Sequence, residues 1–194
     1  MEPNVVQGAF RPRRWWQTWR FALAVLVVVL IIVGGVVYAH VEHDRNVKKQ
    51  NEAAQKSLFA ELSQSTLAQN GDNTTISLAT QLIAGQNAKK YTLSSTDLGQ
   101  VYLDRATSYT NLGKLQQALN DYRTAVKVDS ALQIGALQGE LTVQSRLGNK
   151  SALLPILKQL VTLLQHSEMP LASDQELQYQ DDITAIQNGQ EVSF

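Results

Sequence analysis

The feature that most constrains this chain is an uncharged apolar run near its N-terminus. The run reads FALAVLVVVLIIVGGVVYA from Phe21 to Ala39, nineteen positions without a charged residue, an amide or a proline. Arg20 precedes the run and His40 follows it. A helix of nineteen residues is about 28 Å long at about 1.5 Å per residue, which matches a hydrocarbon core of about 30 Å. Residues 21–39 are therefore predicted to form a single transmembrane helix in contact with the lipid bilayer.

Two other structures can contain an apolar run. A buried helix of a soluble protein would show a polar stripe within about five turns, and none is present here. A cleaved signal peptide stays open because Val37 and Ala39 are small, but signal peptides have apolar regions of about 7 to 15 residues. The greater length of this run favours a helix that stays in the membrane.

The sequence contains no cysteine, which excludes disulfide bonds, a cysteine nucleophile and a lipid-modified cysteine anchor.

Charged residues on the two sides of the run predict its orientation. Residues 1–20 contain four arginines and one glutamate, whereas basic and acidic residues are mixed directly after the run. Basic residues favour the cytoplasmic side of a membrane. The N-terminus is therefore predicted to be cytoplasmic and residues 40–194 to lie outside the cytoplasm, with the helix in the plasma or inner membrane. Three indole rings fit the headgroup layer before the run: Trp15, Trp16 and Trp19.

Within the run, Gly35 and Ala39 form a pair of small residues four positions apart. Such a pair lets two membrane helices approach closely, so a homodimer is left open.

The charge balance argues against a nucleic-acid partner. The whole chain has 17 Lys and Arg against 17 Asp and Glu, a formal net charge of +0. Because four arginines lie before the membrane run, residues 40–194 carry a small negative charge. A domain of this kind has no basic surface with which to hold phosphates by counterion release. We therefore predict no nucleic-acid binding.

Apolar residues recur every three or four positions after the membrane run. No alternation with a period of two, bounded by hairpin turns, interrupts this pattern, so an all-α domain is predicted. The predicted helices cover residues 41–69, 73–84, 98–112, 115–128, 131–147, 151–165 and 173–188, with a polar connector at 86–95. The predicted organisation is a basic, tryptophan-rich segment at 1–20, the membrane helix at 21–39, a juxtamembrane helix at 40–51, a helical domain at 52–188 and a tail at 189–194.

Glycine-containing turns recur between these helices. Gly113 and Gly148 are 35 positions apart, and Gly71 precedes Gly113 by 42 positions with the polar connector as an insertion. Helix pairs repeated at a fixed spacing are typical of an α-solenoid.

The segment from Tyr102 to Asp129 resembles a tetratricopeptide repeat. The family pattern places small residues, aromatic residues and a turn glycine at fixed offsets, and six positions agree with it: Ala106, Tyr109, Gly113, Ala118, Tyr122 and Ala125. The chain departs from the family at Tyr102, where tryptophan is usual, and at Ser130, where proline is usual. The unit at 132–165 is similar only in part but keeps Gly148, and the unit at 52–85 is less similar.

This resemblance implies a solenoid of about three helix pairs, closed by a polar capping helix at residues 173–188. An ordinary helical bundle is the alternative. The resemblance also implies a concave surface, lined by the first helix of each pair, that binds a protein or peptide partner. By the family's spacing, nine residues would line this groove: Gln100, Leu103, Thr107, Thr110, Asn111, Gln138, Thr142, Ser145 and Arg146. Members that clamp a C-terminal carboxylate have lysine and asparagine where this chain has Leu103 and Thr107, so that ligand is not expected.

No pattern in the sequence predicts catalysis, a cofactor or a metal. His40 and His43, beside Asp44, have the spacing of metal ligands but no third histidine nearby. A glycine-rich phosphate loop, a serine nucleophile elbow and an HExxH motif are all missing from the sequence. The sequence therefore favours a membrane-anchored scaffold over an enzyme.

The layout of one membrane helix and one exported repeat domain is similar to that of proteins that assist envelope protein secretion or complex assembly. The alternative is an accessory subunit of a membrane enzyme, or of a division or envelope complex, that associates through its transmembrane helix.

Overall fold

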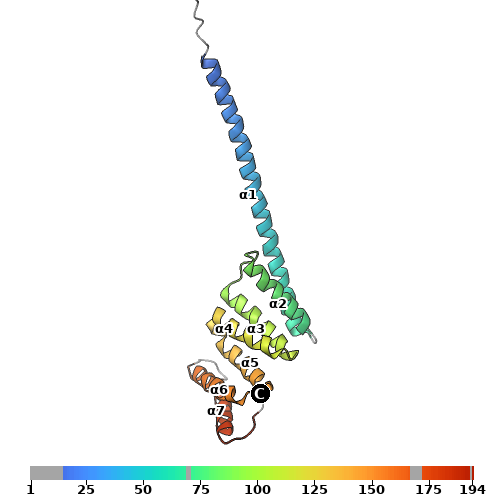
Figure 1. The fold of residues 1–194 in the computed structure, drawn as a ribbon, viewed down its shortest axis with the longest axis vertical. Helices are drawn as coiled ribbons and strands as arrows, with labels where there is room; N and C mark the ends of the chain where they lie inside the picture. The colour runs from blue at the N-terminus through green and yellow to red at the C-terminus, as the bar shows by residue number, and fades with distance from the viewer. Residues whose placement is uncertain (1–14, 69–70, 167–171, 193) are drawn as a thin grey trace, which may run out of the picture. The chain divides into compact units, whose positions relative to one another are not determined.

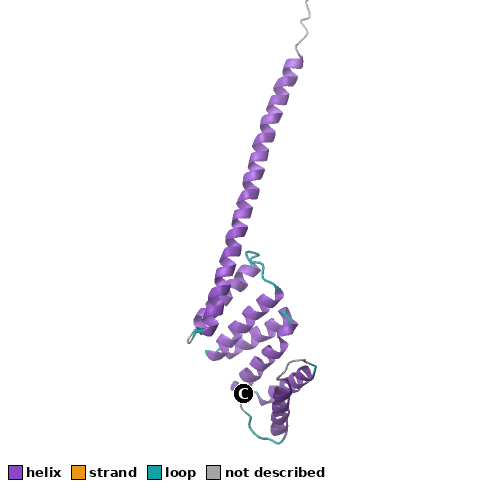
Figure 2. Ribbon diagram, turned by 180° about the vertical axis from the view of Figure 1, so that it is seen from behind, coloured by secondary structure: helices purple, strands orange, loops and turns teal. Residues whose placement is uncertain are grey.

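A computed structural model describes residues 15–68, 71–166, 172–192 and 194 of the chain. Within these ranges the chain is all-helical, with 86% helix and no β-strand, which confirms the predicted helical class. Figures 1 and 2 show the helices. They are α1 (Trp15–Leu67), α2 (Asp72–Asn87), α3 (Ser95–Asn111), α4 (Leu115–Val128), the short 3-10 helix η1 (Ser130–Leu132), α5 (Gln133–Arg146), α6 (Lys150–Gln165) and α7 (Ala172–Gln187).

Helix α1 contains the apolar run. The helix includes an 18-residue stretch with a mean hydropathy of 3.0, and its large apolar side chains from Phe21 to Tyr38 are exposed. The chain thus has one helix long and apolar enough to cross a membrane among its described residues. The predicted helices at 21–39 and 41–69 are one uninterrupted helix, because no proline or glycine follows Gly35 before Leu67. The chain divides into two compact units, Met1–Gln50 and Asn51–Phe194.

In the second unit, each helix packs mainly against its neighbours in the sequence: α2 on α3, α3 on α4, α4 on α5, α5 on α6, and α6 on α7. Three clusters of buried apolar side chains lie between them. The first contains Leu82 and Val101, the second Ala106 and Ala118, and the third Leu157. The third cluster also receives Phe194, so part of the predicted tail at 189–194 packs against the domain.

Two of the turns depend on glycine. Gly113 has φ of +70° and Gly148 has φ of +68°, a left-handed conformation that a side chain makes costly. In the first turn, the amide of Gly113 donates to the carbonyl oxygen of Thr110, and the amide of Lys114 donates to that of Tyr109. These bonds satisfy the last carbonyl groups of α3 and reverse the chain into α4.

The segment predicted as a polar connector at 86–95 is more ordered than its composition indicates. Tyr91 and Leu93 are buried in the first cluster, with 8% and 7% of their surfaces exposed. Two amide side chains bind this backbone, because the amide of Leu93 donates to Gln86 Oε1 at 2.8 Å and that of Thr92 donates to Gln55 Oε1 at 3.0 Å. Its last residue but one, Ser94, caps α3 by accepting from the amide of Asp97. Helix α3 therefore begins at Ser95, three residues before the predicted start.

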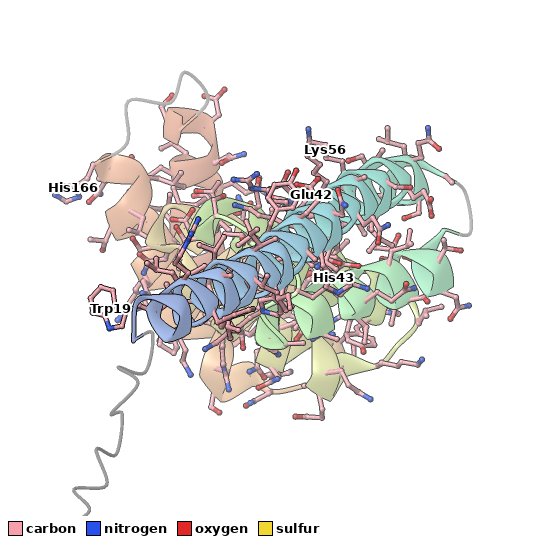
Figure 3. The ribbon with its side chains drawn as sticks, turned by 90° about the horizontal axis from the view of Figure 1, so that it is seen from above. Trp19, Glu42, His43, Lys56 and His166 are labelled. Atoms are coloured by element: carbon pink, nitrogen blue, oxygen red, sulfur yellow. The ribbon has the colours of Figure 1, made fainter. Side chains whose placement is uncertain are left out.

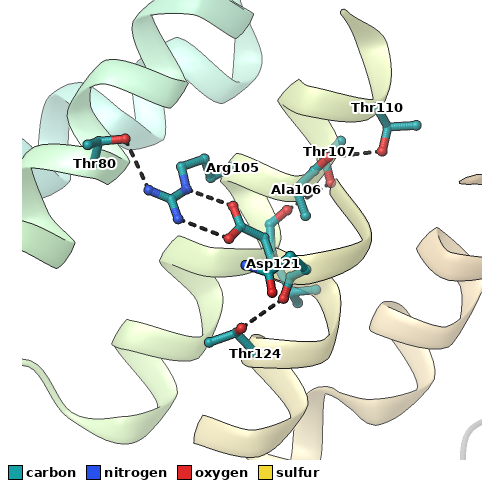
Figure 4. Close-up of polar contacts among 9 residues, drawn as sticks. Thr80, Arg105, Ala106, Thr107, Thr110, Asp121 and Thr124 are labelled. Atoms are coloured by element: carbon teal, nitrogen blue, oxygen red, sulfur yellow. Dashed lines mark hydrogen bonds and ion pairs between the residues drawn. The ribbon is translucent and has the colours of Figure 1, made fainter. Parts of the chain in front are cut away.

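A buried ion pair fixes three helices around the middle of the domain (Figure 4). Arg105 on α3 donates from Nε to Asp121 Oδ2 at 2.7 Å and from Nη2 to Asp121 Oδ1 at 2.9 Å. Its Nη1 donates to Thr80 Oγ1 on α2 at 3.1 Å. The rings of Tyr102 and Tyr109 lie 5.5 and 5.8 Å from the guanidinium. Burial of the guanidinium works to lower the pKa of Arg105, but the hydrogen bonds and charge of Asp121 raise it above its usual value.

Candidate functional site

An open groove of about 450 Å³ lies along one face of α3 and α5. We call it the α3/α5 groove. It is lined by Gln100, Leu103, Asp104, Thr107, Thr110, Asn111, Tyr122, Gly135, Gln138, Gly139 and Thr142.

Helical spacing explains why these side chains share one surface. On α3 the lining residues recur at intervals of three and four, the interval that brings side chains to one face of a helix. On α5 the same interval joins Gly135 to Gly139 and Gln138 to Thr142. The two helices therefore form the walls, and Tyr122 of α4 lies between them.

The floor of the groove depends on a close approach at Gly139. A Cβ atom at that position would collide with the ring of Tyr122, so a glycine is needed for α5 to pack there. Tyr122 is buried, with 4% of its surface exposed. Its hydroxyl lies 3.4 Å from both Thr107 Oγ1 and Thr110 Oγ1. The aromatic ring of Tyr122 thus forms the floor of the groove, and its hydroxyl group contacts two threonines of α3.

Among the described residues that line the groove, Asp104 alone carries a charge at neutral pH. Its side chain is half-buried, and Gln100 Nε2 donates to Oδ1 at 2.8 Å. Burial raises the pKa of Asp104 above its usual value of 3.8, and the hydrogen bond from Gln100 opposes part of this effect. Sequence reasoning missed this residue, because an acidic residue on a partly exposed helix face usually serves only solubility.

The structure brings seven of the nine predicted groove residues together in this cavity: Gln100, Leu103, Thr107, Thr110, Asn111, Gln138 and Thr142. Two of them are less exposed than expected. Thr110 is buried, with 6% of its surface exposed, and Leu103 is half-buried against the second cluster. Both belong to the floor rather than to the exposed walls.

Ser145 and Arg146, the other two predicted groove residues, are not among the residues that line this groove. Ser145 borders a separate cavity of about 330 Å³ together with Lys150 and the segment 189–192. Arg146 Nη1 donates to the carbonyl oxygen of Thr110 at 2.6 Å. The family spacing could not foresee that the C-terminal segment packs beside Ser145, or that Arg146 ties α5 to α3.

Four of the eight positions predicted from the repeat pattern are buried, and the two turn glycines are exposed. Ala106, Ala118 and Ala125 have 0% of their surfaces exposed, whereas Tyr102 and Tyr109 are half-buried beside Arg105. Sequence reasoning missed the ion pair between Arg105 and Asp121. A signal for it exists, because each of the two residues is eight positions from the turn at Gly113, which places them opposite each other in a helical hairpin.

A third cavity, of about 300 Å³, lies between α4, α5 and Gln159 of α6. Its apolar surface comes from Val126, Ala136 and Leu137, beside an ion pair in which Arg123 Nε lies 2.7 Å from Glu140 Oε1. No residue that the repeat pattern predicts for the groove lines this cavity.

The histidines after the apolar run do not gather around a common point. His40 Nε2 lies 3.7 Å from Asp44 Oδ2, and both side chains are exposed. Figure 3 shows Glu42 and His43 leaving α1 in different directions. The described residues contain no group of three or more potential ligands that could hold a metal ion.

Comparisons of this chain with protein-family models, with curated proteins and with solved structures give no match.

Proposed function

We propose that this protein is a membrane-anchored scaffold of the tetratricopeptide type that binds a protein or peptide segment in the α3/α5 groove. The observation that carries the proposal is the agreement between two independent sources. The residues that the repeat spacing assigns to a binding surface are, for the most part, the residues that surround one open cavity. Its volume of about 450 Å³ is within the range of ligand-binding clefts and admits a few side chains of an extended segment.

The packing around the groove supports binding without large rearrangement. Arg105 and Asp121 connect α3 to α4, and Arg146 connects α5 to α3. A rigid groove loses little conformational freedom when it binds, so more of the interaction free energy contributes to affinity. We therefore propose a preformed surface rather than one that folds around its partner.

The apolar run supports the proposed membrane anchor. We propose that residues 21–39 cross the plasma or inner membrane, with residues 1–20 in the cytoplasm and the helical domain outside it. In this position the groove would serve partners in envelope protein secretion or complex assembly. Catalysis is not part of the proposal, because the groove offers one carboxylate and no nucleophile with a neighbouring base.

Gly135 gives a direct test of the groove. It lines the groove, it is exposed, and a Cβ atom there would meet nothing within 4 Å. Gly135→Trp should therefore fill the groove without disturbing the core, because the added side chain enters open space. The matched control is Gln117→Trp, at an exposed position on α4 outside the groove.

The measurement is crosslinking and affinity capture of the full-length protein from its own membranes. We expect Gly135→Trp to lose at least about 90% of the captured partner, a tenfold change in binding, and Gln117→Trp to retain it. Circular dichroism should show the same helicity in both variants. Equal capture by the two variants would contradict the groove as the binding surface.

Association through α1 is the second candidate. The side chains from Phe21 to Ala39 are exposed, and Gly34 and Gly35 have open space where a Cβ would be. A helix with small residues on its surface can pack closely against another membrane helix. In that case the chain would be an accessory subunit or a homodimer, and both tryptophan variants would keep their partner.

A further inference from the structure

We propose that the α3/α5 groove receives a basic side chain, lysine or arginine, of the bound segment, and that Asp104 is its counter-ion. This inference rests on the proposed function, because it names the chemistry of the segment that the scaffold binds. It is argued from the hydrogen bonds that the groove residues already make.

Three amide groups line the groove, and each donates one of its two amide hydrogens to another residue of the chain. Gln100 Nε2 donates to Asp104 Oδ1, and Asn111 Nδ2 donates to Asp72 Oδ1 at 2.9 Å. An ionised carboxylate only accepts hydrogen bonds, so these contacts fix which end of each amide is the nitrogen. The amide oxygens of Gln100 and Asn111 are therefore left as acceptors.

The hydroxyl groups of the groove have used their protons. Thr107, Thr110 and Thr142 each donate to a carbonyl oxygen four residues earlier, at 3.0, 2.9 and 3.1 Å. The hydroxyl of Tyr122 lies near two of these threonines, whose protons are already used, so Tyr122 is the donor there. Each threonine then offers lone pairs rather than a proton to a ligand.

Asp104 adds a negative charge to this acceptor-rich surface. Its Oδ1 accepts from Gln100, whereas its Oδ2 makes no hydrogen bond to any described residue. No fully buried side-chain oxygen among the described residues lacks a hydrogen-bond partner, so Oδ2 reaches the solvent. Partial burial of the Asp104 side chain still removes some of the hydration of its carboxylate. A donor from the ligand would compensate for this loss, and a charged donor most strongly.

Two arginines on the helices that form the groove are occupied elsewhere. Arg105 follows Asp104 in the sequence, but its guanidinium binds Asp121 and Thr80. Arg146 binds the carbonyl oxygen of Thr110. Because neither arginine pairs with Asp104, the charge in the groove is available to a ligand. An ammonium has three donors and a guanidinium five, which matches a surface that offers acceptors.

The test uses the full-length protein in lipid nanodiscs and three pools of fluorescent heptapeptides, random except for a central lysine, norleucine or glutamate. Binding is measured by fluorescence anisotropy. We expect the lysine pool to bind about fivefold more tightly than the norleucine pool, the scale of a partly exposed charge pair. The glutamate pool should bind most weakly. Asp104→Asn should remove the preference for lysine, and Asp104→Lys should shift it to glutamate.

Two controls separate the possible failures. Asp181→Asn removes an equal charge from the exposed surface of α7 and should keep the preference for lysine. Gly135→Trp should weaken the binding of every pool. Pools that need an open groove but show no preference for lysine would overturn the role of Asp104 and leave the groove intact. Pools that bind wild type and Gly135→Trp equally would overturn the proposed function and this inference with it.

Discussion

The two aspartates nearest the middle of the α3/α4 hairpin have opposite surroundings. Asp121 is almost fully buried and accepts two hydrogen bonds from one guanidinium, so its charge is matched. Asp104 is half-buried and accepts one hydrogen bond from a neutral amide, so its charge is unmatched. We assign stability to the first residue and recognition to the second for this reason.

Breaking the buried pair should be costly. Asp121→Asn leaves the guanidinium of Arg105 buried without a counter-charge, and we expect the free energy of unfolding to fall by about 3 to 5 kcal/mol. The double variant Arg105→Leu/Asp121→Leu should lose less, because no charge is left unpaired. Thermal unfolding of the full-length protein in nanodiscs, followed by circular dichroism, gives both values. A loss below about 1 kcal/mol in the single variant would show that the pair is not structural.

Asp104 should make stability depend on pH in the opposite sense to a paired carboxylate. Burial raises its pKa in the folded state above 3.8, so its contribution to stability is full below that value and is lost as the pH rises through the raised pKa. Asp104→Asn should therefore unfold at a higher temperature than wild type at pH 7, and the difference should vanish below about pH 3.8. A variant less stable than wild type at pH 7 would contradict an unmatched charge.

At the scale of the helices, close packing requires small residues. Ala118 and Ala125 on α4 have 0% of their surfaces exposed, and Ala118 packs in the second cluster with Ala106 and Tyr122. Because protein interiors are densely packed, a longer side chain at such a position must displace its neighbours.

Ala118→Leu should therefore destabilise the domain. We expect the free energy of unfolding to fall by about 1 to 3 kcal/mol through overpacking. Gln117→Leu is the matched control, because residue 117 is the exposed neighbour on the same helix and a substitution there should change stability by less than about 0.5 kcal/mol. Chemical unfolding with urea measures both. An unchanged midpoint for Ala118→Leu would refute the packing role of this alanine.

The helices themselves could be predicted from the sequence because their apolar residues follow the period of a helix. Helix α4 has its predicted bounds, Leu115 to Val128. The segment around Tyr91 and Leu93 connects α2 to α3 as predicted, but its ordered backbone was not predicted. This order depends on backbone amides of Thr92 and Leu93 that donate to the side chains of Gln55 and Gln86. Local composition carries no information about such contacts.

The groove could be predicted only in part. The residue spacing of the repeat family predicted which side chains of α3 share one face, because residues three or four positions apart lie on the same side of a helix. It did not foresee the contact of Arg146 with α3, or that Asp104 lines a groove shared with α5, because both depend on how α5 packs against the hairpin. A residue's partners across helices are set by tertiary packing and not by its offset in a repeat.

At the scale of the whole molecule, the distribution of charge is as informative as its sum. The formal net charge is +0, but four arginines lie before the apolar run and the remaining charge after it is negative. This asymmetry is the basis of the proposed orientation.

The orientation can be tested with protease added to spheroplasts. We expect an epitope at the C-terminus to be digested while an epitope at the N-terminus is protected, because the proposed span leaves residues 40–194 outside the cytoplasm. A cytoplasmic protein serves as the control for membrane integrity. Protection of the C-terminal epitope in intact spheroplasts would reverse the orientation.

The central claim is that a partner segment lies in the α3/α5 groove, and site-specific photocrosslinking tests it most directly. A photoreactive residue would replace Gly135 or Thr142 in the groove, or Gln117 outside it, in the full-length protein in its own membranes. Mass spectrometry would then identify the crosslinked segment. We predict that both groove positions crosslink to the same segment of one partner, with a lysine or arginine near the attachment point, and that position 117 does not. Crosslinks to that partner from position 117 and from neither groove position would contradict the account.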